Sequence, residues 1–163
     1  MATKGNTSVN KGIPVIKDAF VVIVKTEWNT PIINKLATGV KKICREQGVK
    51  YKVLTVPGAF EIPFAVKNHY TYCKVLPDAY ITLGTVIRGD TPHFDYVCKA
   101  ITDGVLQLNL SLDIPVIFGI LTVDNEQQAL DRIGGKHGHK GREAAEVAYE
   151  MVSLLRQLNG RGE

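Results

Sequence analysis

The chain has 163 residues, which is enough for one ordinary domain and too few for two substantial ones. Hydrophobic residues make up 45% and charged residues 22%, both close to the averages of globular proteins, so intrinsic disorder, collagen-like repeats and a disulfide scaffold are excluded. The formal net charge of +4 suits an anionic small ligand but gives little reason to expect nucleic acid as a partner.

The cysteines and the hydropathy of the chain bear on its location. Cys44, Cys73 and Cys98 lie far apart and form no C-x-x-C pair, which favours free thiols in a reducing compartment. The first fourteen residues contain no apolar segment typical of a signal peptide, and no apolar stretch approaches the roughly 20 residues that span a bilayer. We therefore expect a soluble, cytoplasmic protein with no membrane partner.

The first half of the chain predicts two strand–helix pairs. The expected elements are a strand at Phe20–Lys25, a helix from Thr30-Pro31 to Gly48, a strand at Tyr51–Val56 and a helix within Ala59–Tyr72. Thr30 is expected to cap the first helix, with Pro31 in its first turn. The strand residues are almost continuously apolar, which is typical of parallel strands buried on both faces.

The second half continues the alternation. We expect a strand at Ala79–Val86 and then a helix that opens at Thr91-Pro92, with Thr91 as its cap, and runs to about Leu112. A strand at Val116–Val123 and a helix at Asn125–Ile133 capped by Asp124 should follow, and then a glycine-rich loop at Gly134–Gly141 and a final helix through Ala144 to Leu158. This order predicts an α/β three-layer sandwich with a mainly parallel four-stranded sheet and right-handed crossovers. A single domain over residues 1–163 is expected, with residues 1–14 as a flexible N-terminal arm.

The loops that follow the strands are the candidate ligand site, because open α/β sheets bind ligands outside the carboxyl ends of their strands. Three of these loops place an aromatic residue beside a polar one, namely Trp28 with Asn29, Phe60 with Glu61, and Phe94 with His93. This combination suits a flat ligand that forms hydrogen bonds. Taken singly, Trp28 would more often be a core or interface residue, and Glu61 a partner of the helix dipole.

The loop after the third strand has the spacing of a phosphate-binding P-loop, Gly84-x-x-x-x-Gly89-Asp90-Thr91. Asp90 stands where the P-loop lysine reaches the phosphates, so a nucleoside triphosphatase is disfavoured. Gly89 lets the backbone approach a ligand, and the unpaired amides of the next helix can bind an anion, although a glycine chosen only for a tight turn explains the pattern equally well. His93 in that first turn is expected to be neutral and able to accept a proton, but a lone histidine is more often structural.

The loop Gly135–Gly141 carries two histidines and several cationic residues. No carboxylate or cysteine lies at a ligand spacing from His137 and His139, so no metal site is expected there. The cationic residues are most simply a solvated basic turn, although Lys140 and Arg132 could reach an anion.

Four segments, in order, resemble the lumazine synthase family. They are Val56–Pro63, Gly84–Phe94, Pro115–Thr122, and Glu126–Arg132 continuing through Lys140-Gly141, and the match covers nearly the whole chain from Phe20 to Leu158. The resemblance implies a flavodoxin-like fold and the penultimate step of riboflavin biosynthesis. In that step a ribitylamino-substituted diaminouracil condenses with 3,4-dihydroxy-2-butanone 4-phosphate to give 6,7-dimethyl-8-ribityllumazine, phosphate and water, with no metal or organic cofactor.

The resemblance also assigns roles position by position. Trp28 would stack on the heterocycle and Asn29 would hydrogen-bond the ligand, while Val86 and Ile87 would present backbone groups to the pyrimidine edge. The ribityl chain would be held by Ala59, Phe60 and Glu61, and the phosphate by Gly89, Asp90, Thr91 and Arg132. His93 would shuttle protons, Phe118 would pack on the heterocycle from a neighbouring subunit, and Lys140 would add a positive contact.

Some positions depart from the commonest family pattern. Asp90 places a negative side chain beside the expected phosphate site, so its carboxylate must point away from the anion. His137 and His139 stand where smaller or amide residues are usual. Trp28 replaces a frequent phenylalanine, and this leads to the hypothesis that the end product riboflavin stacks more strongly there.

The resemblance implies an assembly as well. Family members form pentameric rings with active sites between neighbours, and in many species twelve rings close an icosahedral shell. The absence of an insertion between Arg132 and Lys140 favours the 60-subunit shell. The N-terminal arm resembles a strand that pairs with a neighbour's sheet.

Two other functions remain open from the sequence. One is a non-catalytic flavin-binding protein, and the other is a shell protein that kept the scaffold and lost the chemistry. The intact set of Trp28, Glu61, Thr91, His93 and Arg132 favours the enzyme. A related riboflavin-forming enzyme fits the motifs less well.

Overall fold

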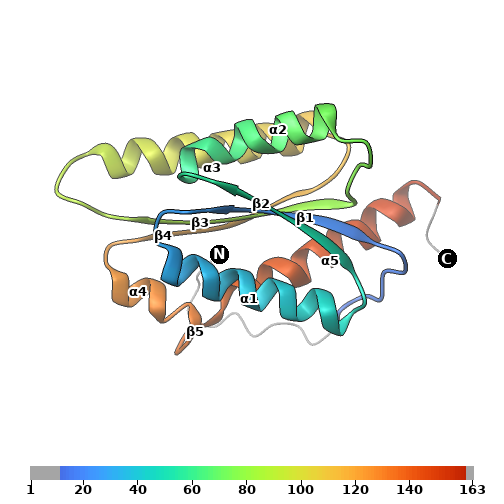
Figure 1. Cartoon of the computed structure of the whole chain (residues 1–163), viewed down its shortest axis with the longest axis horizontal. Helices are drawn as coiled ribbons and strands as arrows, with labels where there is room; N and C mark the ends of the chain where they lie inside the picture. The colour runs from blue at the N-terminus through green and yellow to red at the C-terminus, as the bar shows by residue number, and fades with distance from the viewer. Residues whose placement is uncertain (1–11, 161–163) are drawn as a thin grey trace.

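The computed structural model describes residues 12–160, and its centre is a four-stranded parallel sheet of order β2-β1-β3-β4. The strands are β1 (Phe20–Thr26), β2 (Lys50–Val56), β3 (Ala79–Ile87) and β4 (Val116–Val123). Two helices, α1 (Thr30–Glu46) and α5 (Lys140–Leu158), cover one face of the sheet, while α2 (Ile62–Tyr72) and α3 (His93–Ser111) cover the other (Figure 1). The predicted three-layer α/β fold is therefore confirmed.

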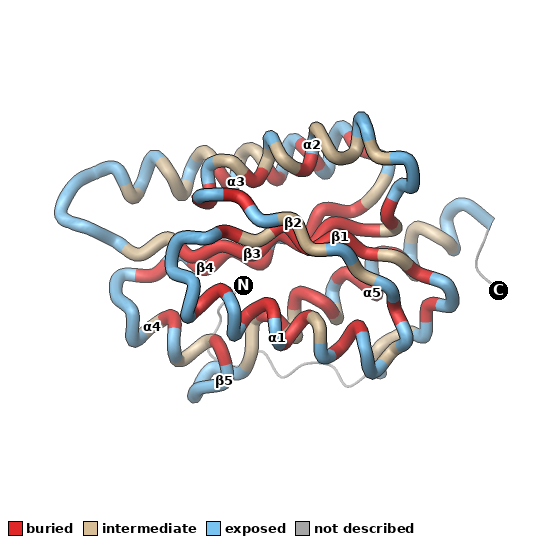
Figure 2. Tube along the Cα trace, in the orientation of Figure 1, coloured by how far each residue is buried: buried red, intermediate tan, exposed pale blue. Residues whose placement is uncertain are grey.

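Apolar side chains fill the space on both sides of the sheet. Val21 and Ile23 belong to the core under α1 and α5, while Val22 and Val24 belong to the core under α2 and α3. This alternation along β1 follows from the two-residue period of a strand, and its four valine and isoleucine side chains are completely buried. Figure 2 shows the continuous buried layer along the sheet.

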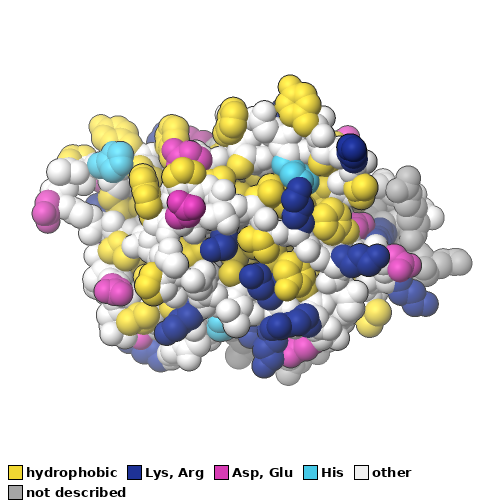
Figure 3. Space-filling model, in the orientation of Figure 1, with side chains coloured by type: hydrophobic (Ala, Val, Ile, Leu, Met, Phe, Trp, Pro, Cys, Tyr) yellow, Lys and Arg dark blue, Asp and Glu magenta, His cyan; other side chains and the backbone are white. Residues whose placement is uncertain are grey.

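The expectation that all four strands are buried on both faces is wrong for β2. Only Val56 of this edge strand is buried, while Tyr51, Val53 and Leu54 pack only partly against the two cores and the two lysines of the strand are exposed. Lysine and arginine side chains gather on the face of the molecule that presents β2 and α1 (Figure 3). Charged residues on an edge strand discourage pairing with a foreign chain.

All three predicted helix caps are wrong. Helix α3 begins at His93, so Pro92 rather than Thr91 stands at its cap position. The residue before α1 is Asn29, which adopts the left-handed conformation with φ 59°, while the hydroxyl of Thr30 donates to the carbonyl of Glu27. Asparagine tolerates this backbone region better than most residues. The helix α4 (Glu126–Leu130) is capped by Asn125 rather than Asp124, since the side-chain Oδ1 of Asn125 accepts from the backbone amide of Gln128 at 3.0 Å.

The predicted glycine-rich loop contains a short hairpin. Strands β5 (Ile133–Gly135) and β6 (Gly138–His139) pair in antiparallel fashion, and α5 begins at Lys140, earlier than the sequence indicated. The remaining element is a single 3₁₀ turn, η1 (Ala59–Glu61), directly before α2. The predicted N-terminal arm strand falls mainly on residues 1–11, which lie outside the described residues, and Gly12–Pro14 form no strand.

Within residues 12–160, none of the helices is long and apolar enough to cross a membrane.

The start of α5 packs against α1 so closely that Gly141 has no room for a side chain. A Cβ at Gly141 would overlap the backbone carbonyl of Leu36, which cannot move away as a flexible side chain would. We therefore expect Gly141→Ala to destabilise the fold by about 1–3 kcal/mol, as overpacking of a core does. Urea unfolding measures this change. Gly89→Ala is the matched control, since nothing lies within 4 Å of its Cβ, and equal midpoints for the two variants would contradict the packing argument.

Candidate active site

Three loops meet at the carboxyl ends of β1, β2 and β3. The strand order reverses between β1 and β3, and this is the switch point at which such sheets form a ligand crevice. The loops after β1 and β2 are joined by two backbone hydrogen bonds, from Glu27 N to Val56 O at 2.8 Å and from Trp28 N to Pro57 O at 3.1 Å. Asn29 bridges to the third strand, since its Nδ2 donates to the carbonyl of Thr85 at 3.0 Å.

Trp28 and Glu61 are positioned by the same glycine. A Cβ on Gly58 would lie 2.7 Å from ring atoms of Trp28, so the indole packs directly on the Gly58 backbone while 68% of its surface remains exposed. The amide of Gly58 donates to Glu61 Oε2 at 3.0 Å. Glu61 therefore caps the turn η1, as its position at a helix start suggested, and its other carboxylate oxygen has no hydrogen-bond partner among residues 12–160.

The residues predicted to hold the ribityl chain and the pyrimidine edge lie around this crevice. Phe60 is exposed next to Glu61, whereas Ala59 is buried in the core and has only its backbone to offer. Val86 and Ile87 are half-buried at the end of β3 and pack against the two opposite cores.

The loop between β3 and α3 presents unpaired backbone amides. In the part of the chain that the structure describes, the N–H groups of Gly89, Asp90 and Thr91 donate to no other residue, and the same holds for His93 and Phe94 in the first turn of α3. All of residues 88–93 are exposed. Successive free amides at a helix N-terminus attract an anion, which supports the phosphate prediction for Gly89, Asp90 and Thr91.

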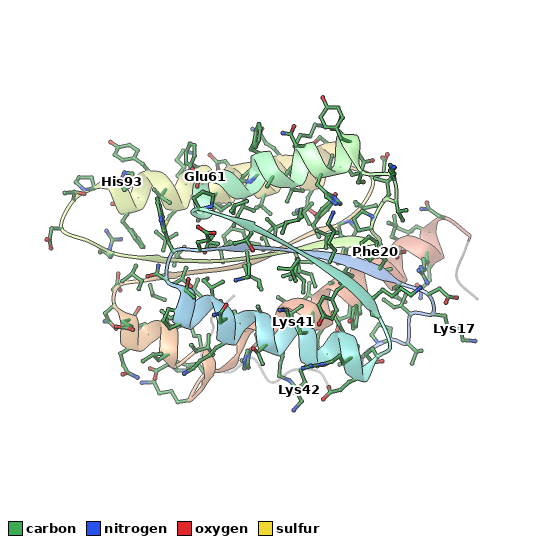
Figure 4. All side chains as sticks on the ribbon, in the orientation of Figure 1. Lys17, Phe20, Lys41, Lys42, Glu61 and His93 are labelled. Atoms are coloured by element: carbon green, nitrogen blue, oxygen red, sulfur yellow. The ribbon has the colours of Figure 1, made fainter. Side chains whose placement is uncertain are left out.

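His93 is the first residue of α3 and lies at the same end of the molecule as Glu61, opposite Phe20 at the start of β1 (Figure 4). Its imidazole is exposed to solvent. No side chain within residues 12–160 hydrogen-bonds to it, so both ring nitrogens are available for proton transfer.

Arg88 holds this loop in place, and the sequence analysis gave it no role. Its Nε donates to Asp124 at 3.1 Å and its Nη2 to Asp95 at 3.1 Å, while the guanidinium carbon lies 4.1 Å from the centre of the Phe94 ring. The hydrogen bonds to Asp95 and then Asp124 raise the pKa of Arg88. The sequence carries a signal for this contact, since Arg88 directly follows a strand and Asp95 lies in the first turn of the next helix.

The other predicted residues lie in a separate groove along the free edge of β4. The groove has a volume of about 640 Å³ and is bounded by α3 and α5, with Phe118, Arg132 and Lys140 among its lining residues. Arg132 Nη1 donates to the carbonyl of Gln128 at 2.7 Å, and Lys140 Nζ lies 2.5 Å from Glu143. Phe118 is 42% exposed on the edge strand.

The structure thus divides the predicted site into two groups within one chain. None of the residues at the carboxyl ends of β1, β2 and β3 lines the β4-edge groove, so Arg132 and the amides of Gly89–Thr91 do not share a cavity. The predicted phosphate set is split between the two places.

The hairpin β5–β6 gives His139 a packing role. A Cβ on Gly39 of α1 would overlap the His139 ring, so this histidine docks the hairpin onto α1. Its Nδ1 is buried without a partner among the described residues, and burial lowers the pKa of His139. Its neighbour His137 is exposed.

A parallel sheet of order β2-β1-β3-β4, with helices on both faces, defines a flavodoxin-like α/β protein. The family model described as 6,7-dimethyl-8-ribityllumazine synthase matches residues 18–156. The chain therefore belongs to this family, and the resemblance seen in the four sequence segments is confirmed.

Curated relatives with the same description match this chain along most of their length. A 6,7-dimethyl-8-ribityllumazine synthase of Parabacteroides distasonis is 48% identical over 145 residues, which cover 87% of this chain and 89% of the relative. The enzymes of the same name from Bacteroides fragilis and Porphyromonas gingivalis are 46% and 44% identical, covering 84% and 90% of this chain and 96% and 91% of the relatives.

The packing of Trp28 on Gly58 can be tested by fluorescence, because Trp28 is the one tryptophan of the chain. We expect Gly58→Ala to push the indole off the turn and to change its emission maximum, since the added methyl group would occupy the position of the ring. Gly89→Ala, in open space, should leave the emission unchanged. Identical spectra for all three proteins would show that Trp28 does not pack on Gly58.

Proposed function

We propose that this chain condenses 5-amino-6-(D-ribitylamino)uracil with 3,4-dihydroxy-2-butanone 4-phosphate, forming 6,7-dimethyl-8-ribityllumazine, phosphate and water in an active site built between two copies of the chain. Membership of the synthase family supports the reaction. The observation that carries the shared site is the division of the candidate residues between the switch-point crevice and the β4-edge groove.

The two groups complement each other chemically. The crevice offers an exposed indole on one side only, and a flat heterocycle gains most when it is stacked from both sides. Phe118, exposed on the β4 edge, is the aromatic side chain that a second copy would bring to the opposite face. Between them, Glu61 and the backbone of Val86 and Ile87 provide hydrogen-bonding groups for the ribityl chain and the pyrimidine edge.

The phosphate would likewise be held from two sides. The free amides of Gly89, Asp90 and Thr91 form an anion-binding turn in one copy, and Arg132 of the second copy would add a charge-assisted hydrogen bond. Lys140 in the same groove adds positive charge. Phosphate leaves during the reaction, so a site that stabilises the departing anion favours the chemical step.

His93 is the residue proposed to move protons. It stands in the same first helical turn as the free amides, within the region where the phosphate would leave, and its ring nitrogens are unoccupied by any described residue. Imine formation, phosphate elimination and ring closure each need a proton added or removed near the butanone carbons. An imidazole can both accept and donate a proton, so one residue can serve in both directions.

The β4 edge is suited to being covered by another copy. Exposed apolar side chains of α5 lie along the groove: Val147 and Met151 line it, and Leu154 and Leu158 line an adjoining pocket that shares Met151 with it. A contiguous apolar rim around a cleft is typical of a subunit interface. A junction in which one face binds a different face is heterologous, and it gives a ring when its rotation closes. The family resemblance implies that this ring is a pentamer. The icosahedral 60-subunit shell and a cytoplasmic location, expected from the sequence, belong to the same proposal.

The shared site predicts that two defective chains restore each other. Alone, His93→Ala should lose activity by about 10²–10⁴-fold, the usual contribution of a general acid–base group. Arg132→Ala should weaken binding of the phosphate substrate. In a co-expressed mixture, about one junction in four pairs an intact crevice with an intact groove, since the faces combine at random. Lumazine absorbance then reports activity well above that of either variant.

The control for complementation is a mixture made after each variant has assembled separately. Activity no higher than the average of the two variants in the co-expressed sample would contradict a shared site, as would sedimentation of the unmodified protein as a monomer. An unmodified protein that forms no lumazine above the uncatalysed rate would contradict the reaction itself and would favour a flavin-binding or shell protein.

The indole of Trp28 predicts binding of the end product riboflavin by stacking. Riboflavin titration should quench the Trp28 fluorescence, because the isoalloxazine ring would lie on the exposed face of the indole. Trp28→Phe keeps an aromatic ring with a smaller stacking area, and its affinity, measured by equilibrium dialysis, should be lower. Absence of quenching in the unmodified protein would count against the hypothesis.

A further inference from the structure

We propose that Arg88 is a positioning residue that fixes the phosphate loop and the His93 turn of its own active site and, through Asp124 and helix α4, the orientation of Arg132 in the β4-edge groove. This inference rests on the proposed function. Arg88 lies outside the set of candidate site residues, and it is the side chain that connects the two separated groups within one chain.

One arm of the connection reaches the first turn of α3. Nη2 and Nη1 of Arg88 donate to the two carboxylate oxygens of Asp95, at 3.1 and 3.5 Å, and the guanidinium plane stacks on Phe94. Phe94 and Asp95 directly follow His93. The backbone amide of Arg88 is itself fixed, since it donates to the carbonyl of Val123 at 2.9 Å and extends the β3–β4 pairing.

This anchoring compensates for the loop's lack of other contacts. Gly89, Asp90 and Thr91 form no hydrogen bonds with other residues in the range 12–160, so the loop is held only at its two ends. Arg88 lies at the N-terminal end of the loop, and its side chain also contacts Phe94 and Asp95 in the helical turn at the other end. Free amides bind an anion well only when their orientation is fixed before binding, because ordering them would otherwise cost conformational entropy.

The second arm reaches Arg132 by a short series of hydrogen bonds. Arg88 Nε donates to Asp124, the amide of Asp124 donates to Gln128 Oε1 at 3.0 Å, and the carbonyl of Gln128 accepts from Arg132 Nη1 at 2.7 Å. Helix α4 lies between Asp124 and Arg132 and is one turn and a half long. Loss of the Asp124 anchor would release the start of α4 and, with it, the hydrogen bond that orients Arg132.

A role in positioning fits the chemistry of Arg88 better than direct binding of phosphate. Its Nε, Nη1 and Nη2 already donate to carboxylates, and two negative side chains neutralise its charge. Lysine cannot replace it, since an ammonium group has no planar fork with which to hold two carboxylates and cover an aromatic ring. The contact is also exposed, so its contribution to overall stability should be small.

The test separates positioning from support of the fold. In Arg88→Ala we expect KM for the butanone phosphate and the inhibition constant of inorganic phosphate to rise at least about tenfold, a loss of about 1.4 kcal/mol, with KM for the pyrimidine nearly unchanged. Arg88→Lys should lie close to Arg88→Ala. Asp95→Asn and Asp124→Asn each remove the negative charge from one of the two partners of Arg88. Both variants should show intermediate increases in KM for the butanone phosphate and in the inhibition constant of phosphate.

The matched control is Lys99→Ala, which removes another exposed ion pair of α3, between Lys99 and Asp103 at 2.6 Å, away from the loop. It should leave both KM values and the thermal midpoint unchanged. Unchanged phosphate constants in Arg88→Ala would overturn the proposal, as would an equal loss for both substrates accompanied by a large fall in the thermal midpoint.

Binding of inorganic phosphate, measured by calorimetry, keeps this test independent of turnover. Tighter binding by the unmodified protein than by Arg88→Ala supports the positioning role even if no lumazine is formed, in which case the proposed function alone fails. Equal phosphate affinities in a protein that does form lumazine overturn the Arg88 proposal and leave the function intact.

Discussion

The parallel pairing of β1 with β3 is the constraint on which the rest of the structure depends. From β1 the chain crosses through α1 to β2 on one side, and from β3 it crosses through α3 to β4 on the other, so the loops that leave the two central strands diverge. The predicted ligand crevice lies where they part. Asn29 spans it with a hydrogen bond to Thr85 on β3, and its left-handed backbone turns the chain directly into α1.

The position of β4 at the end of the sheet has the opposite consequence. Helices α3 and α5 cover the two faces of β4, but its outer edge is unpaired and leaves a groove between them. The groove contains an aromatic side chain, two cations and an apolar rim. Neither the crevice nor the groove by itself offers a complete site for two substrates of which one is a flat heterocycle and the other a phosphate ester. A second copy that buries the apolar rim would complete both, so burial of apolar area and assembly of the site would be driven by the same contact.

Charge is used in two different ways around the site. Arg132 lines the open groove, and Lys140 lines the same groove while paired with Glu143. Arg88 is instead committed to Asp95 and Asp124, and its value lies in geometry, since exposed ion pairs stabilise a fold by little. The loops after the strands are fixed by three short connections. These are the Gly58–Glu61 turn, the Asn29–Thr85 hydrogen bond and the contact of Arg88 with Asp95.

The sequence by itself determined the four strands, the order of helices and the family. Apolar runs such as Val21–Val24 specify strands through local side-chain periodicity, and the spacing of Gly84 to His93 specifies a strand, a turn and a helix without reference to distant residues. The tertiary structure decided what depends on contacts between segments far apart in the chain. It made β2 an exposed edge, selected Asn29 and Asn125 over their neighbours as caps, joined Arg88 to Asp124, and placed Arg132 and Phe118 away from the loops with which they were grouped. No local pattern encodes these outcomes, because strand order and packing settle which chain segments face each other.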